Sequence, residues 1–151
     1  MILKKELIEL ELEIPNSDLL KTSVSTKEVK WHIDHSLKVI IGIANALKNS
    51  KPEDFKSSFN LTRTYIFLLG FIPRGKGKAP KSVVAQGEIQ HYELIEQLNQ
   101  AKIILKKMDD FPAKSHFDHP YFGKLNLRQS IAFLEIHTKH HLKIIRDIIQ
   151  K

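Results

Sequence analysis

The apolar residues of this chain recur at helical spacing over long stretches, and prolines separate these stretches. The pattern predicts helices over 3–12, 26–47, 60–71, 90–108 and 127–149. Sustained alternation of apolar and polar residues, which would indicate a strand, occurs only in the short segment ELELEIP. The chain is therefore predicted to be a single all-α domain over 1–151, built as a helical bundle.

Two long irregular segments interrupt the predicted helices. The segment IPRGKGKAPKSVVAQG holds three glycines and two prolines, and AKSHFDHPYFGKLN precedes the last helix. Both are predicted to be loops. Asn126 is the predicted N-cap of the last helix. Ser25 is the predicted N-cap of the 26–47 helix, because Glu28 three residues later would complete a capping box.

The composition indicates an ordinary globular protein, with 42% hydrophobic and 27% charged residues. The N-terminal segment lacks a signal-peptide core, and no apolar run approaches the ~18 residues of a membrane span. We therefore expect a cytoplasmic protein that has no membrane contact. The absence of cysteine excludes disulfides, a thiolate nucleophile and thiolate metal ligands. Any metal must be bound by imidazole, carboxylate or water.

The net charge of +7 would permit contact with nucleic acid or with acidic ligands. The lysines are spread over several helix faces, so we do not expect nucleic-acid binding. The basic loop over 73–81 could close over an acidic substrate, but it lacks the GK[ST] of a P-loop. A solvated loop is the simpler interpretation.

The chain has eight histidines, of which five fall into two tight groups. His32 and His35 lie in WHIDHSL, and His137, His140 and His141 lie in HTKHHLKII. At 100° per residue, His32, His137 and His141 fall on the apolar faces of their helices. His35 and His140 fall at the edges of these faces. The pattern suggests a metal held between two helices.

Histidines at positions i and i+4 can bind one metal, and a third ligand must then come from another helix. His137 and His141 form such a pair, and His32 can supply the third ligand. Three imidazoles leave coordination positions open, as in catalytic sites, where a bound water has its pKa lowered toward ~7. The alternative is that these histidines are hydrogen-bonded core residues. Leaving each one unpaired in the core would cost ~1–3 kcal/mol, which favours a shared partner.

The carboxylates beside the histidine groups are predicted to be surface charges. Asp34 and Glu135 both fall on the outward faces of their helices. HTKHH also lacks the glutamate of HExxH, which disfavours a zincin-type peptidase. No inward carboxylate base is therefore predicted near the histidines.

Three elements in this order, WHIDHSL, HPYFGKLNLRQS and HTKHH, give the chain a family resemblance over about 25–149. It resembles the DinB-like (YfiT-like) metalloprotein superfamily, and within it a branch of unknown function with an HP-x-FG-x-L element. The resemblance implies a four-helix bundle, here with an extra short N-terminal helix and two long loops, and commonly a homodimer.

The resemblance also implies the ligands and the metal. His137 and His141 match the H-x3-H pair of the superfamily. His32 matches the first ligand, with Ser36 as the small residue four places on, and His35 is the alternative. His140 is an extra histidine that would act as a second-shell or proton-transfer group. The metal implied is zinc or nickel, and imidazole ligands also suit iron.

The leading functional hypothesis is a metal-dependent enzyme that activates water or a thiol. It would hydrolyse a small-molecule substrate or transfer a thiol to it, as characterised relatives in the superfamily do. The alternative is a non-catalytic ligand- or metal-binding bundle with a stress-related role. The lack of an inward carboxylate base favours this alternative, and the substrate stays open under either hypothesis.

Overall fold

The structure is a computed structural model that describes residues 2–75, 83 and 87–150. Most of the chain is helical, as the sequence predicts. The helices are α1 (Lys4–Glu13), α2 (Val29–Asn49), α3 (Leu61–Leu69), α4 (His91–Lys107) and α5 (Leu127–Ile149). Short 3-10 turns lie at Ile14–Asn16, Pro52–Asp54 and Met108–Asp110. Most of the basic loop over 73–81 lies outside the described residues.

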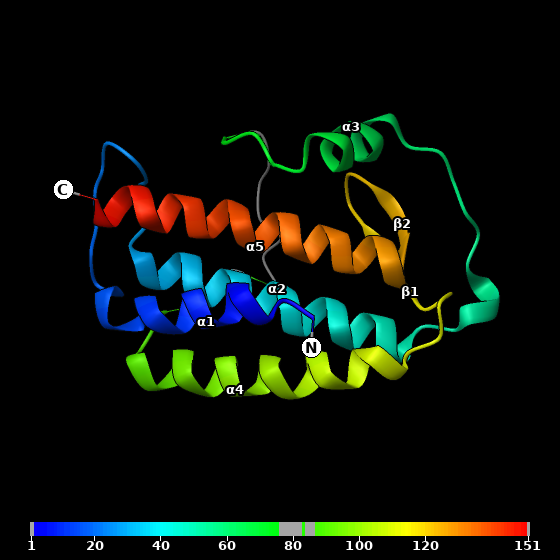
Figure 1. The fold of residues 1–151 in the computed structure, drawn as a ribbon, viewed down its shortest axis with the longest axis horizontal. Coiled ribbons are helices and arrows are strands. Elements are labelled where there is room, and N and C mark those ends of the chain that lie inside the picture. Colours follow the sequence, from blue (N-terminus) through cyan, green and yellow to red (C-terminus); the bar gives the residue numbers. More distant parts are fainter. Residues whose placement is uncertain (1, 76–82, 84–86, 151) are drawn as a thin grey trace.

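Helices α1, α2, α4 and α5 lie side by side, with α1 and α2 both between α5 and α4 in the view of Figure 1. Helix α2 packs against α4 and α5, and α1 contacts these same two helices. The core between them contains fully buried leucines and isoleucines, each of which contributes about 1.5–3 kcal/mol through burial. Examples are Leu7, Ile33, Leu37, Leu94 and Leu134. This packing brings α2 and α5, the two helices that carry the histidine groups, into contact.

The predicted start of α5 is confirmed, whereas that of α2 is wrong. Asn126 Oδ1 accepts the backbone N–H of Gln129 at 2.9 Å, and the Gln129 side chain accepts the N–H of Asn126 in return. This reciprocal pair is a capping box. In contrast, α2 begins only at Val29, so Ser25 is not its N-cap. The Ser25 hydroxyl instead lies 3.0 Å from Nε2 of His32.

The segment that precedes α5 is an antiparallel hairpin, which corrects the prediction of a loop. Strand β1 (His116–His119) pairs with β2 (Gly123–Asn126) in the register His119↔Gly123. Gly123 has a φ of 68°, a left-handed conformation that glycine adopts without a Cβ penalty. Figure 1 shows the hairpin near the start of α5, beside α3. The hairpin therefore places its turn next to α5.

Arg63 connects α3 to this hairpin. Its buried guanidinium donates hydrogen bonds to the backbone carbonyls of Ser58, Phe122 and Lys124. The planar fork of arginine can serve several acceptors at once. A single side chain thereby fixes α3 and the segment before it against the hairpin.

Replacing Arg63 with alanine should lower the free energy of unfolding by about 2–4 kcal/mol, because buried carbonyls lose a charged donor. Arg63→Lys should recover only part of this loss, since an ammonium lacks the fork. Urea denaturation of the three proteins measures the difference. Equal stability of all three would contradict the role assigned to Arg63.

Candidate metal centre

Three histidines from α2 and α5 converge on one point. His35, His137 and His141 each offer a ring nitrogen, and these three atoms all lie within 4.8 Å of one another. The Nε2 atoms of His35 and His137 are 3.2 Å apart. The ring of His141 lies 4.8 Å from that of His35 and 4.7 Å from that of His137, centroid to centroid. We call these three residues the histidine group.

The histidine group fits a divalent metal. Two nitrogens bound to a tetrahedral zinc ion lie about 3.3 Å apart, close to the distance between the two Nε2 atoms. His35 Nδ1 lies 3.0 Å from the carbonyl oxygen of Val83, which can only accept, so this nitrogen carries the proton and Nε2 has a free lone pair. His137 Nδ1 is buried and has no hydrogen-bond partner in the described part of the chain.

His32 lies behind His141. Its Nδ1 is 3.0 Å from Nδ1 of His141, and its Nε2 faces the Ser25 hydroxyl. Metal-binding histidines commonly donate their second ring N–H to such a partner, which fixes the ring. An N–H donated from His141 Nδ1 to His32 would leave Nε2 of His141 as the free nitrogen. The sequence assigned His32 to the ligand set with His35 as the alternative, and the structure places His35 with His137 and His141.

Burial lowers the pKa of every imidazole in this region. Desolvation is the main cause for His137 and His141, and neighbouring imidazoles add to it, so the pKa of each lies well below 6.5. Desolvation also lowers the pKa of His35, and it lowers that of His32 to about 4. These histidines are therefore neutral at pH 7, which is the form that binds metals.

His140 lies beside His141, at the edge of the histidine group. Its Nδ1 is 2.9 Å from the carbonyl oxygen of Ile72, and its ring meets that of His141 edge-on. Because the carbonyl can only accept, Nδ1 carries the proton of the neutral ring. Its Nε2 therefore keeps a lone pair that can accept a proton or a hydrogen bond.

The prediction that Asp34 is a surface charge is wrong. Its side chain is buried and accepts hydrogen bonds from Lys38 Nζ at 2.8 Å and Gln97 Nε2 at 2.9 Å. Because Gln97 lies on α4, Asp34 serves the packing of α2 against α4. Glu135 is exposed and pairs with Lys139, as expected of a surface charge. Within the described ranges, no carboxylate joins the histidine group.

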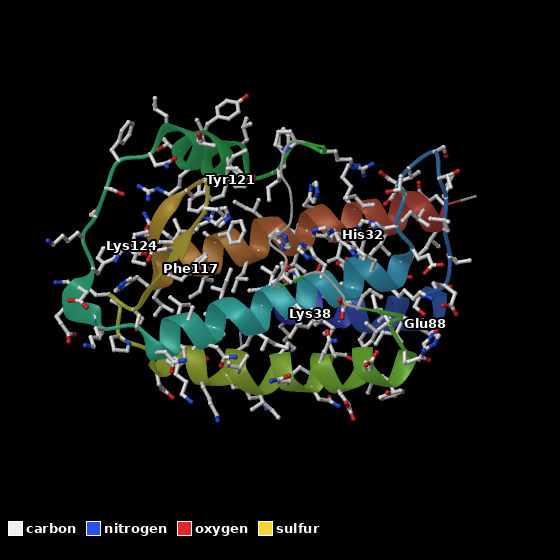
Figure 2. The ribbon with its side chains drawn as sticks, turned by 180° about the vertical axis from the view of Figure 1, so that it is seen from behind. His32, Lys38, Glu88, Phe117, Tyr121 and Lys124 are labelled. Carbon is white, nitrogen blue, oxygen red and sulfur yellow. The ribbon has the colours of Figure 1, made fainter. Side chains whose placement is uncertain are left out.

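A cavity of about 450 Å³ has the histidine group in its wall. Its lining comes from α2, α5, the segment after α3 and the hairpin, and it is mainly apolar. Figure 2 shows Phe117 and Tyr121 at the hairpin, and both line the cavity. Trp31, the only tryptophan, also lines it and stacks on the His35 ring at 4.9 Å. The pairing of β1 with β2 brings the hairpin residues to this cavity, and the sequence prediction of a loop did not include that pairing.

Comparisons of the chain with protein-family models, with curated proteins and with solved structures gave no match. Among the described residues, no helix is long and apolar enough to cross a membrane.

Proposed function

We propose that the protein is a metal-dependent enzyme of the DinB-like type. In this proposal α1, α2, α4 and α5 form the four-helix bundle, so the short N-terminal helix, predicted as an extra element, belongs to the bundle and α3 is the additional helix. His35, His137 and His141 bind a divalent metal. The observation that carries the proposal is the convergence of three neutral imidazoles in the wall of an apolar cavity. Zinc or nickel is the expected metal, and the same ligands suit iron.

The proposed reaction is hydrolysis of a small molecule or transfer of a thiol to it. A metal bound by three imidazoles retains open coordination positions and supplies Lewis acidity that activates water or a thiol. The Val83 carbonyl orients His35, and His32 orients His141. His140 would accept the proton of the nucleophile at Nε2, because its Nδ1–H is held by Ile72. The apolar cavity walls would exclude bulk water.

The proposal predicts about one equivalent of metal in protein purified without a histidine tag, and none in His137→Ala. Elemental analysis measures both. His91→Ala is the matched control, because this exposed histidine starts α4 and lies outside the histidine group. Its metal content should equal that of the native protein. If the native protein takes up no zinc, nickel or iron even after loading, the proposed function is wrong.

A screen of ester, amide and thiol-acceptor substrates then tests catalysis in metal-loaded protein. Turnover that disappears on chelation and returns with metal is the expected result. A metal-loaded protein that turns over none of these substrates would contradict the enzymatic proposal.

A non-catalytic metal- or ligand-binding bundle is the second candidate. The observation that favours it is the absence of a carboxylate from the histidine group within the described residues. Without such a group, the proton acceptor that the described residues offer beside the ligands in this proposal is His140, an imidazole with a lowered pKa. Metal uptake without turnover, and ligand binding that survives chelation, would favour this candidate.

The homodimer implied by the family resemblance is also a proposal. The exposed face of α3 is apolar, with Leu61, Tyr65 and Leu68 all more than half exposed. Faces of this kind are common in subunit contacts. Sedimentation equilibrium distinguishes a dimer from a monomer.

A further inference from the structure

The cavity beside the histidine group is suited to an uncharged ligand. Among the described residues that line it there is no lysine or arginine, and the only carboxylate is that of the exposed Asp118. Its walls are formed mostly by aliphatic and aromatic side chains, among them Val39, Ile43, Phe122 and Phe133. Cavities of this type bind apolar molecules and use a few polar groups to orient them. The polar side chains of this lining are those of Trp31, Asp118, Tyr121 and the histidines, so most of the groups that could orient a ligand here are imidazoles.

His119, at the end of β1, is a histidine of this cavity that lies outside the histidine group. Its Nδ1 accepts the backbone N–H groups of Tyr121 at 3.1 Å and Phe122 at 3.2 Å. A nitrogen that accepts hydrogen bonds carries no proton, so this network assigns the proton of the neutral ring to Nε2. His119 is therefore a hydrogen-bond donor at Nε2, and its Nδ1 is not free to act as a base.

The ring of His119 is held firmly in this orientation. It stacks on Phe122 at 4.3 Å with an interplanar angle of 10°, and it meets Phe133 edge-on at 4.6 Å. Desolvation lowers the pKa of His119 to about 4, so the ring remains neutral at pH 7. No acceptor in the described part of the chain takes the Nε2–H. His119 Nε2 is not among the fully buried atoms that lack a partner in the described residues, so this donor is accessible to an acceptor on a ligand in the cavity.

We propose that His119 donates a hydrogen bond from Nε2 to an uncharged carbonyl oxygen of an apolar small molecule bound in this cavity. The substrate class is then a ketone, ester or amide with an apolar body. As a statement about substrate, this inference rests on the proposed function, and it adds the group that recognises the carbonyl. His119 is a binding residue that would hold the carbonyl near the histidine group.

Acetophenone and α-methylstyrene test this proposal. The two molecules have nearly the same shape. Acetophenone has a carbonyl oxygen where α-methylstyrene has a CH2 group. Ligand-observed NMR gives the dissociation constant of each for chelator-treated protein, so that no metal contributes. The measured quantity is the ratio of the two constants in the native protein and in variants of His119.

Two variants separate the roles of the two ring nitrogens. His119→Asn keeps an oxygen acceptor near the position of Nδ1 for the two backbone N–H groups, but it removes the donor at Nε2. The preference for acetophenone should fall roughly three- to tenfold, the value of one buried hydrogen bond. The affinity for α-methylstyrene should stay the same. His119→Gln restores an N–H donor near the position of Nε2 and should recover much of the preference.

An equal ratio in the native protein and in His119→Asn would overturn the proposal. A second measurement needs no variant: the carbonyl 13C resonance of labelled acetophenone bound to the chelator-treated native protein. A resonance near its value in water indicates a hydrogen-bonded carbonyl, and one near its value in an alkane overturns the proposal. Failure of the proposed function would be seen separately, as a lack of metal uptake, and would not change these ligand measurements.

Discussion

His35→Ala should abolish stoichiometric binding of zinc, whereas His32→Ala should weaken it only about 10–100-fold. The difference follows from their positions. His35 Nε2 faces His137 Nε2 at 3.2 Å, whereas His32 contacts the Nδ1 side of His141. Removing a ligand destroys the site. Removing a residue that only orients a ligand typically lowers the metal affinity by about 10–100-fold. Competition titration with a chromophoric chelator measures both affinities.

The two variants also decide between the ligand sets that the sequence left open. If His32→Ala abolishes binding and His35→Ala only weakens it, His32 is the ligand and the assignment made from the structure is wrong. Ser25→Ala gives a graded control, because it removes only the hydroxyl that faces His32. Its effect on zinc affinity should be smaller than that of His32→Ala. Circular dichroism should show the same helix content in all three variants.

Acidification should destabilise the metal-free protein strongly between pH 6.5 and about pH 4. Histidines in the unfolded chain take up protons near pH 6.5, whereas burial lowers the pKa of His32 and of His119 to about 4 in the folded state. The unfolded state therefore binds more protons in this interval, so the free energy of unfolding falls as the pH falls. For His32 alone, the shift from 6.5 to about 4 corresponds to about 3 kcal/mol.

Other histidines add to this effect, because the pKa values of His35, His137, His140 and His141 are also lowered. Thermal denaturation at pH 7.5, 6.5, 5.5 and 4.5 in the presence of a chelator gives the pH dependence. His32→Asn, which cannot titrate, should reduce the proton uptake on unfolding by about one. A melting temperature that stays constant from pH 7.5 to pH 4.5 would show that these imidazoles are not held neutral in the folded protein.

The sequence predicted the last helix well. Its apolar stripe places His137 and His141 inward, and the structure has both in the histidine group. Asn126 caps the helix where the sequence placed the cap. This success has a physical reason. A helix with one buried face has a clear apolar stripe, so a helical wheel shows which side chains point to the core and which to solvent.

On α2 the same reasoning placed His32 correctly but misplaced Asp34 and His35, because this helix is buried on more than one side. Because α2 packs against both α4 and α5, its buried surface is much wider than one stripe. Ile33, Asp34 and Leu37 are buried toward neighbours that a single apolar face does not anticipate. The helical wheel therefore placed Asp34 on the exposed face of the helix and His35 at the edge of its apolar face. Only the packing of three helices shows that Asp34 meets Gln97 on α4 and that His35 meets His137 on α5.

The hairpin was missed for a different reason. Its strands have four residues each, too few to show a period of two, and neither strand has a regular alternation of apolar and polar side chains. The pairing depends on Gly123, the first residue of β2, which has a left-handed conformation, and on the contacts that Arg63 makes from α3. These contacts join segments about 60 positions apart, which no local pattern can report.

The contact between α2 and α5 has a thermodynamic consequence. His35 and His137 are 102 positions apart in the sequence, and the chain between them includes α3, α4 and the hairpin. An ion that binds both residues would close this long loop. Closing a loop of that length restricts the unfolded chain, as a disulfide does, by about 4–5 kcal/mol in the chain-entropy treatment. A chain without cysteine would thereby gain a reversible crosslink. A chelator or acid would remove this crosslink, whereas a thiol reductant, which breaks disulfides, would not.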